Sequence, residues 1–505
     1  MIDVLVVGAG SSGCAVAARA SENPNLQVTL VEAGPDYIDP TDLPFDLVNS
    51  HNNSYRKHDW QFQYEPTRDR AQPFPRGRVV GGSSAVNTTI ALRGIPEDYD
   101  EWSDLGNNEW SWEKVLPAFN RLERDLDFGE SPYHGDAGPI TIRRYPDSEL
   151  EPQHLAFLDA ARSLGYPDCP DQNDPYGWGS GPQPMNKLGR LRISCAIGYL
   201  APARARPNLD IRANSFTRRL LFDGDRCTGI EIETASGVEK IEAKTTIVCA
   251  GAIMTPHLLM HSGIGPKAQL KTLNIPLLRD LPVGQNLSDH PAISVVLKAK
   301  SGINIDFDAP IIQTILRYTA ENSNKRNDLQ IEQLSFVGQN DNTPRFGIAG
   351  VLEYQYGRGE LTLTSADPHV APKIDNRFCE DERDLRRMVS CFKDTLAFAQ
   401  KGAVAEMSEE IQFPNLSRGS SDEDLASLCR KFAGSGYHPC GTAKMGDDET
   451  AVVDQYGRVH QLENIVVADA SIMPFVPRAN TNLTAIMIGE KIGEWLRTDP
   501  GRYGL

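Results

Sequence analysis

Apolar and polar positions alternate in blocks along the first thirty-odd residues. Residues 2–7 form an apolar run, the turn GAGSSG follows, and a stretch of small residues, CAVAARAS, leads to a second apolar run, QVTLVEAG. A helical segment between two continuous apolar runs is typical of a βαβ unit whose parallel strands are buried on both faces. The pattern predicts an α/β fold with a doubly wound, Rossmann-like domain at its start.

The remaining segments carry weaker patterns. Residues 208–250 contain three strand-like stretches, and two charged helices are predicted near 381–400 and 421–432. The end of the chain is predicted as strand, loop and helix, in ENIVVADASIMP, FVPRANTN and LTAIMIGEKIGEWLR. Residues 35 to about 75 are rich in Pro, Asp and Asn without clear periodicity, so we predict a long loop or lid over a ligand.

Composition and charge exclude several classes of protein. The 505 residues carry a formal net charge of −17, and so acidic a surface repels phosphate backbones, which argues against nucleic-acid binding. The nine cysteines are scattered and include no C-x-x-C pair, so neither a disulfide framework nor a metal site is predicted. This usage is typical of buried thiols in a reducing compartment.

The chain shows no targeting or membrane pattern. It starts directly with the predicted strand, without a charged leader or a cleavable apolar run. No window reaches the roughly 18 uninterrupted apolar residues that a membrane span needs. We therefore expect a cytoplasmic protein without a membrane span, and its oligomeric state is left open.

Gly8, Gly10 and Gly13 form a G-x-G-x-x-G turn between the first strand and the helix. The first glycine makes the turn, the second lets the backbone approach a pyrophosphate, and the third lets the helix pack on the strand. Glu32 ends the second strand about twenty residues later, where a carboxylate can accept from ribose hydroxyls and disfavours a 2′-phosphate. The alternative is a packing turn without a ligand. The unit predicts dinucleotide binding and does not separate FAD from NAD.

A second glycine-rich stretch, GRVVGGSSAVNTTIALRG, runs from Gly77 to Gly94. Its small residues at 81–84 could present backbone N–H groups to a phosphate or to a flavin ring. Taken alone, a hairpin or the start of a helix explains them equally well.

Five stretches together resemble one family. GRVVGGSSAVN resembles the first signature of the glucose-methanol-choline (GMC) family of FAD-dependent oxidoreductases, in which such a segment passes the flavin. CAGAIMTPHLLMHSGIGP, LPVGQNLSDHP, YHPCGTAKMG and VVADASIMPFVPRANTNLTAIMIGE resemble later segments of that family, in the same order. The resemblance extends from residue 4 to about 495, although residues 291–430 match by length rather than by motif.

This resemblance implies roles for individual residues. His438 matches the histidine proposed as the base at the reactive edge of the flavin, and Asn480 matches the second active-site position. Val86 occupies the position through which some members attach FAD covalently, so we expect non-covalent FAD. The cofactor-binding residues predicted in this way and from the glycine-rich turns are Gly8, Gly10, Ser11, Ser12, Gly13, Glu32, Ala33, Arg78, Val80, Gly82, Ser83, Asn87, Thr88, Ala250, Asp469, Ala470, Thr481 and Asn482.

Elementary chemistry agrees with these roles. When a hydride leaves an alcohol carbon, the hydroxyl proton must leave at about the same time, and a histidine whose pKa is near neutrality suits that task. Asn480 cannot take a proton but can donate to the developing alkoxide. Other interpretations remain open: His438 could be a structural loop residue, or Cys440 could act beside it as a nucleophile. His290, which follows Asp289, is interpreted as structural.

A chain of this length predicts more than one domain. We predict a discontinuous FAD-binding domain and a mixed-sheet, α+β substrate-binding domain laid over the flavin. The predicted FAD-binding segments are 1–150, with the lid at about 35–75, then 201–290, and 431–505 with the catalytic loop. The predicted substrate-domain segments are 151–200 and 291–430.

The predicted function is FAD-dependent oxidation of an alcohol to an aldehyde or ketone, by hydride transfer to the flavin with a histidine base. The partners implied are a small-molecule alcohol and an electron acceptor, either oxygen or another redox carrier. The resemblance leaves two alternatives: an FAD-containing lyase of the same fold, similar to hydroxynitrile lyases and without net redox, and a flavin-binding protein without turnover. No motif specifies the alcohol, or whether the enzyme is an oxidase or a dehydrogenase.

Overall fold

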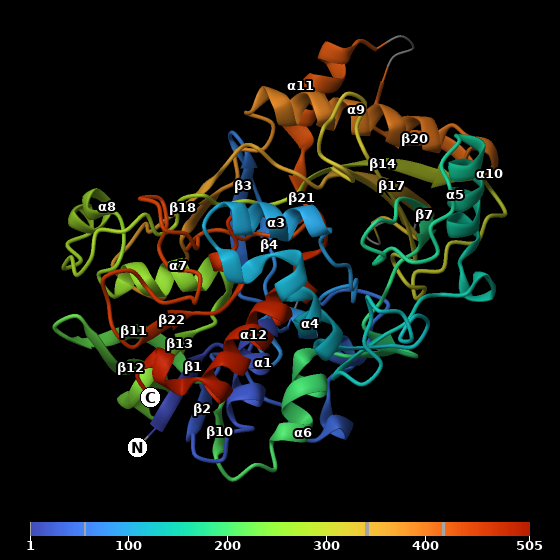
Figure 1. The fold of residues 1–505 in the computed structure, drawn as a ribbon. Helices are drawn as coiled ribbons and strands as arrows, with labels where there is room; N and C mark the ends of the chain where they lie inside the picture. Colours follow the sequence, from blue (N-terminus) through green and yellow to red (C-terminus); the bar gives the residue numbers. More distant parts are fainter. Residues whose placement is uncertain (1, 55–56, 339–342, 417–419) are drawn as a thin grey trace.

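Two seven-stranded sheets organise the protein in a computed structural model, which describes residues 2–54, 57–338, 343–416 and 420–505 (Figure 1). The first sheet lies in the lower part of Figure 1, beside both chain termini, and the second lies above it, near the long helix α9 (Glu382–Ala399).

The first sheet is parallel through its centre. Its parallel strands lie in the order β10 (Leu209–Arg212), β2 (Val28–Val31), β1 (Ile2–Val7), β13 (Gly237–Val248) and β22 (Ile465–Val467). β1 and β2 are buried along almost their whole length, as continuous apolar runs require. Helix α1 (Ser11–Ala20) connects them, so the α/β class and the βαβ unit predicted at the start of the chain are confirmed.

Strand β13 joins this parallel core to an antiparallel extension. Its carboxyl-terminal half pairs with β1, whereas its first half pairs with β12 (Arg226–Thr234), which in turn pairs with β11 (Phe216–Asp223). Together with β10, these strands account for the three strand-like stretches predicted in residues 208–250, of which the second forms both β11 and β12.

Helices from opposite ends of the chain pack together on the first sheet. On α12 (Thr481–Thr498), a Cβ added to Gly489 would lie 2.4 Å from the carbonyl oxygen of Ser12, and one on Gly493 would lie 2.8 Å from the Cβ of Arg19. A Cβ on Gly13 would lie 1.9 Å from the carbonyl oxygen of Gly8. Glycine at these positions therefore sets how closely α1 approaches α12 and the end of β1.

A buried carboxylate ties this helix pair to its neighbours. Glu490 of α12 accepts hydrogen bonds from Arg19 of α1, from Arg121 of α4 (Trp112–Leu122) and from the hydroxyl of Tyr199. The side chain of Glu490 is completely buried. Because two arginines compensate its charge, the carboxylate is a junction of three helical segments.

The second sheet is antiparallel. Its strands lie in the order β20 (Ser408–Phe413), β14 (Pro291–Ala299), β17 (Arg345–Leu352), β16 (Leu329–Leu334), β15 (Thr314–Tyr318) and β7 (Gly179–Pro182), with β21 (Gly434–Ser435) also paired to β14. Helices α5 (Pro152–Ser163), α9 and α10 (Gly402–Met407) pack against this sheet. Along β14 every second residue is fully buried, which is the alternation expected of a strand with two different faces.

Residues 35–75 differ from the irregular lid predicted for them. Their described part contains helix α2 (Phe45–Val48) and a hairpin of β3 (Phe62–Thr67) and β4 (Arg70–Phe74). The hairpin extends into a four-stranded sheet with β19 (Lys373–Asp375) and β18 (Glu360–Thr362). Its buried rings, on Phe62, Tyr64 and Phe74, supply an alternation that the Pro- and Asp-rich surroundings obscured. Residues 55–56 of the predicted lid lie outside the described residues.

The other elements are shorter connections. The remaining helices are α3 (Pro96–Asp104), α6 (Ala201–Ala203), α7 (Gly251–His261), α8 (Lys267–Thr272) and α11 (Asp422–Phe432), and the remaining strands are β5 (Glu123–Asp125), β6 (Ile140–Ile142), β8 (Lys187–Leu188) and β9 (Leu191–Arg192). Helices α9 and α11 coincide with the two charged helices predicted from the sequence. Within the described ranges, no helix is both long and apolar enough to cross a bilayer.

The two sheets draw on different segments of the chain. The predicted substrate-domain segments, 151–200 and 291–430, supply β7, β14, β15, β16, β17 and β20 of the second sheet. Strand β21 comes from the last predicted FAD-binding segment and joins the same sheet. The chain thus passes from one sheet to the other at β21, immediately before His438.

Candidate active site

A cavity of about 470 Å³ lies between the two sheets, a volume in the usual range for cofactor and substrate pockets. Gly8, Gly10 and Glu32 line it at the carboxyl ends of β1 and β2, and Ser294 and Glu332 line it from the second sheet. Ligands of doubly wound folds bind at the carboxyl ends of the parallel strands. The cavity therefore lies where the sequence predicts a dinucleotide.

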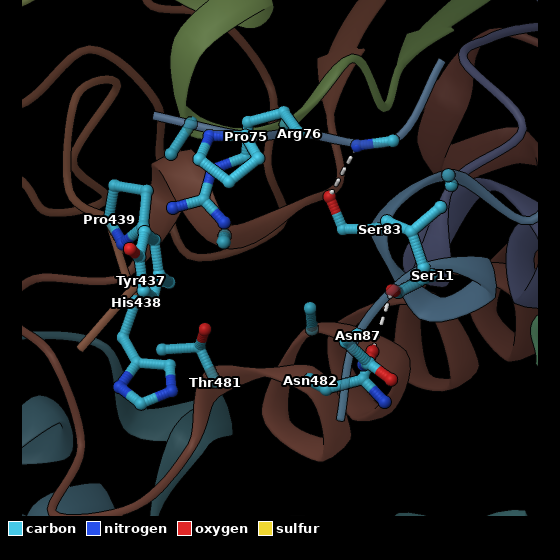
Figure 2. Close-up of a pocket in the computed structure, with 18 of the residues that line it drawn as sticks. Ser11, Pro75, Arg76, Ser83, Asn87, Tyr437, His438, Pro439, Thr481 and Asn482 are labelled. Carbon is cyan, nitrogen blue, oxygen red and sulfur yellow. Dashed lines mark hydrogen bonds between the residues drawn. The ribbon is translucent and has the colours of Figure 1, made fainter. Parts of the chain in front are cut away.

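Most of the predicted cofactor residues gather on this cavity. The lining includes Gly8, Gly10, Ser11, Ser12, Glu32, Ala33, Gly82, Ser83, Asn87, Thr88, Ala250, Asp469, Ala470, Thr481 and Asn482. Figure 2 shows Ser11, Ser83, Asn87 and Asn482 around one part of the space, with His438 and Thr481 at another. Val86 also lines the cavity.

Three predicted cofactor residues do not line the cavity. Gly13 packs α1 against the end of β1 instead. Val80 is buried, and its backbone N–H donates to the carbonyl of Pro35. The exposed side chain of Arg78 lies with its guanidinium over the ring of Trp60, 5.0 Å from the ring centroid. Of the three, Arg78 is therefore the one whose side chain contacts a lining residue, Trp60.

Glycine residues, which have no side chain, shape the end of the cavity nearest β1. Gly82 has a φ of +52° and lies against the first turn, since a Cβ on it would lie 2.6 Å from the Cα of Gly10. A Cβ built on Gly10 would meet no described atom within 4 Å, so its outer side faces open space. The first N–H groups of the ten-residue helix α1 follow directly and favour an anion such as a pyrophosphate.

The start of α12 presents unsatisfied polar atoms at the same cavity. Ser11 donates to Oδ1 of Asn482 across 2.7 Å, the contact dashed in Figure 2, and Nδ2 of Asn482 is buried without a partner. Oδ1 of Asn480 is also buried without a partner. Unpaired buried amide groups point to a missing polar ligand. A flavin offers both donors and acceptors, so these residues fit FAD.

Two buried carboxylates lie at the dinucleotide end. Glu32 accepts from the N–H groups of Ala9 and Gly34, both at 2.9 Å. Asp469 accepts from the N–H of Gly251 at 2.8 Å and from three further donors on Thr255 and Ser471. Burial raises the pKa of Glu32 to about 7 and also raises the pKa of Asp469. Asp469 therefore fixes the start of α7, and Glu32 fixes the first turn beside the site predicted for a ribose.

The loop that carries His438 is fastened to the second sheet. Ser435 of β21 pairs with Pro291 of β14, and the N–H of Gly436 donates to the carbonyl of His290. A Cβ on Gly436 would lie 3.1 Å from Nδ1 of His438, so glycine permits the close approach. The proline after His438 favours an extended backbone there. These contacts place the histidine at the edge of the cavity.

Asp289 completes this attachment. Its carboxylate accepts from the backbone N–H groups of His290 and His438, both at 2.8 Å, and from the side chains of Ser435 and Asn376. The residue is almost completely buried. The two histidines are therefore held by one carboxylate as well as by the strand pairing.

The imidazole of His438 is held from both sides. Nδ2 of Asn480 lies 2.9 Å from Nε2, and Nδ1 of His290 lies 2.9 Å from Nδ1. With the amide assigned in this orientation, Nε2 accepts, so the proton of His438 resides on Nδ1 and is donated to His290. The unprotonated Nε2 faces Asn480 at the start of α12. An alcohol oxygen that displaces this contact could donate to Nε2 and accept from the amide.

Burial keeps both imidazoles neutral. It lowers the pKa of His438 well below the usual range, and His290 and Arg76 lower that pKa further. It also lowers the pKa of His290 to about 3. The near-neutral pKa expected from the sequence is thus replaced by a lower one, because the ring lies beneath an enclosed cavity. With its pKa lowered in this way, His438 is unprotonated at neutral pH.

Two sequence interpretations change at this point. His290, interpreted as structural, contacts the candidate base directly. Cys440 is fully buried, and burial raises the pKa of its thiol, so it lacks the thiolate character of a nucleophile. In the sequence, the adjacent Asp289 and His290 of SDHP were the pattern that could have indicated a role for His290 in the site. Its meaning depends on a contact with His438, 148 positions away.

A separate buried ionic cluster lies outside this cavity. Glu123, Asp125 and His134 bring three potential metal-ligand atoms within 4.8 Å of one another. Arg144 donates to both oxygens of Asp125, and Arg93 pairs with Glu123. These carboxylates raise the pKa of His134 to about 10 despite its burial. The arginines and the imidazolium neutralise the acids, so the cluster is an ion-pair network that ties β5 to its surroundings.

Models of known protein families match most of the chain. The amino-terminal model of the GMC oxidoreductases matches residues 2–292, and the carboxyl-terminal model matches residues 355–489. The chain belongs to the GMC oxidoreductase family. It is therefore an FAD-dependent oxidoreductase, and the resemblance seen in its motifs is confirmed.

Individual relatives of this GMC oxidoreductase align over nearly full length. It is 33% identical to a 5-(hydroxymethyl)furfural oxidase of Methylovorus sp., with 99% of each chain covered. It is 33% identical to an oxygen-dependent choline dehydrogenase of Escherichia coli, covering 98% of this chain and 95% of the relative. Among solved structures, pyridoxine 4-oxidase from Mesorbium loti superposes with a TM-score of 0.91 at 28% identity, with 98% of each chain covered.

Proposed function

We propose that this GMC oxidoreductase oxidises a small alcohol to an aldehyde or ketone, with His438 as the base. The observation that carries the proposal is the position of His438, which lines the cavity with its Nε2 2.9 Å from the amide nitrogen of Asn480. The relatives include oxidases and dehydrogenases of alcohols by their names, which supports the same class of reaction.

His438 and Asn480 have different roles at the substrate hydroxyl group. Nε2 of His438 accepts the hydroxyl proton, and Nδ2 of Asn480 donates to the oxygen as negative charge develops on it. Nδ1 of His438 stays hydrogen-bonded to His290, so the ring cannot turn away. Bound FAD supplies the two-electron acceptor that amino-acid side chains lack. Turnover also requires an external electron acceptor, either oxygen or a redox carrier.

We infer that FAD is held without a covalent bond. Val86 occupies the position at which some relatives attach the cofactor, and a valine has no group that could form that bond. Acid precipitation of the holoprotein should release the yellow flavin into the supernatant. Flavin that stays in the protein pellet would contradict the inference.

Net oxidation is favoured over the lyase alternative by the kind of relatives found, since their names describe oxidases and dehydrogenases. The two alternatives differ in the fate of the flavin absorbance. An oxidoreductase loses it when an alcohol is added without oxygen, whereas a lyase cleaves a cyanohydrin with the absorbance unchanged.

The deciding experiment is anaerobic flavin reduction across choline, short aliphatic, aromatic, furanic and sugar alcohols. We expect at least one class to bleach the flavin, and His438→Ala to slow that reduction by about a hundredfold or more. His460→Ala, at a histidine outside the cavity lining that bonds the carbonyl of Gly446, is the control and should change nothing. The proposal fails if no alcohol reduces the flavin, or if His438→Ala reduces it at the original rate.

A further inference from the structure

The second sheet presents one face to the cavity in a regular pattern. On β16 the lining residues are Gln330, Glu332 and Leu334, so every second side chain points the same way. Ala349 and Val351 of β17 line the cavity with the same spacing, as do Ala292 and Ser294 of β14. This face consists of small and apolar side chains apart from Ser294, Gln330 and one carboxylate, Glu332.

Strand register places this carboxylate away from the base. Ala292 is the second residue of β14 and pairs with Gly434 of β21, so it lies beside the loop of His438. Ser294 pairs with Ala349, and Ala349 pairs with Glu332. Glu332 therefore lies two strands away from β14, about 10 Å across the sheet.

Two amide groups donate hydrogen bonds to the side chain of Glu332. Its Oε1 accepts from Nε2 of Gln330 at 2.6 Å and from Nε2 of Gln183 at 3.3 Å. Its Oε2 makes no hydrogen bond to any described residue. The amide oxygens of both glutamines are likewise buried without a partner. This end of the cavity thus has an excess of hydrogen-bond acceptors.

No described cation balances this carboxylate. Burial raises the pKa of Glu332 to about 7, although the hydrogen bonds from Gln183 and Gln330 lower it, and no arginine or lysine acts on that pKa. Arg76 also lines the cavity, but its charge acts on Asp289, Tyr437 and His438 at the other end. A partly buried carboxylate that faces a cavity without a counter-ion gains from a positively charged partner.

We propose that Glu332, oriented by Gln183 and Gln330, binds a protonated amino group at the far end of the alcohol substrate. The substrate class is then an elongated amino alcohol, with its hydroxyl at His438 and its ammonium group two strands away, and an apolar middle against Ala349 and Val351. This assignment rests on the proposed alcohol oxidation for the position of the hydroxyl group. An ammonium can donate to Oε2 of Glu332 and to the unpaired amide oxygen of Gln330, and both residues line the cavity.

Amino alcohols and neutral alcohols of the same length test the proposal. Anaerobic flavin reduction is measured with 3-aminopropan-1-ol, 6-aminohexan-1-ol and 8-aminooctan-1-ol, each beside the alkanol in which a methyl group replaces the ammonium. For the longer pairs we expect kcat/KM to favour the amino alcohol by about tenfold or more, and the shortest pair to show less preference. Glu332→Gln should bring the ratio for the longer pairs close to one.

Glu410→Gln is the matched control, since Glu410 is an exposed carboxylate on β20 of the same sheet and does not line the cavity. Its ratio should equal that of the original protein. A ratio near one in the original protein, or a ratio retained in Glu332→Gln, would overturn the proposal.

Calorimetric titration with hexylammonium chloride separates this inference from the proposed function, because it needs no turnover. The holoprotein should bind it saturably, and Glu332→Gln should weaken binding about tenfold or more. Binding of hexylammonium without oxidation of any alcohol would support the amine site and contradict the proposed function. Oxidation of alcohols with no binding of hexylammonium would do the reverse.

Discussion

Replacing His290 by phenylalanine tests whether the second histidine positions the base. The two imidazoles meet edge to face, with ring centroids 5.0 Å apart at an interplanar angle of 74°. Phenylalanine keeps a ring of similar shape in a site that is completely buried, so packing is largely preserved. What is lost is the acceptor at Nδ1, which receives the proton of His438 across 2.9 Å.

The size of the effect follows from that one contact. The Nδ1–H of His438 would be left without a partner in a buried setting, which costs about 1–3 kcal/mol. A ring that turns to another partner must repay this amount to return to the productive orientation, and at 1.36 kcal/mol for each factor of ten the rate of flavin reduction falls roughly fivefold to 150-fold. The ring could also recover a partner by turning or by changing tautomer, which would move its free lone pair away from Asn480.

Anaerobic stopped-flow measurement of the limiting rate of flavin reduction is the assay. His290→Asn restores an acceptor near the position of Nδ1 and should recover part of the lost rate. His154→Phe is the control: His154 is equally buried, but it bonds Thr314 and Ser335 outside the cavity lining. The reasoning is refuted if His290→Phe reduces flavin within twofold of the original rate, or if His154→Phe slows it as much.

Three further predictions concern stability and cofactor retention. Burial lowers the pKa of His154 to about 3, so below pH 6.5 the unfolded chain binds a proton that the native state does not bind. The free energy of unfolding should therefore fall on acidification, with His154 contributing about 1.4 kcal/mol per pH unit. Urea unfolding at pH 7 and pH 5 should show a smaller fall in this free energy for His154→Phe than for the original protein. Glu490→Ala leaves Arg19 without its buried partner and should cost about 3–5 kcal/mol, visible as a lower thermal midpoint than that of Glu494→Ala, a half-exposed neighbour. Gly13→Ala places a methyl 1.9 Å from a backbone oxygen and should yield protein with little bound flavin by absorbance; full occupancy would contradict the packing role.

Local patterns were sufficient to predict the dinucleotide end of the site. The glycine-rich turn and the two apolar runs lie within some thirty residues, so their meaning does not depend on distant parts of the chain. Backbone geometry explains why the prediction succeeds, since only glycine tolerates the approaches of Gly8, Gly13 and Gly82. The same local logic could not show that Arg78 turns outward onto Trp60.

Other parts of the site depend on contacts between distant segments. The hairpin in the predicted lid pairs β3 with β19, which lies some 300 positions along the chain, so its short alternation was not recognisable beforehand. The contact between His290 and His438 exists because β21 pairs with β14. Glu332 becomes part of the cavity only through the register of three strands. The spacing of residues along the sequence does not indicate such strand pairings.

The packing of α12 against α1 has a consequence for biosynthesis. The contact between Ser11 and Asn482 joins residues 471 positions apart. At about 5–20 residues per second, the ribosome needs roughly half a minute to a minute and a half between making the first of these residues and the second. Throughout that interval the face of α1 that packs against α12 is exposed, and the flavin site is incomplete, so bound flavin cannot stabilise the nascent chain. Yield in the cell should therefore depend on chaperones that shield the amino-terminal unit until the last helix arrives.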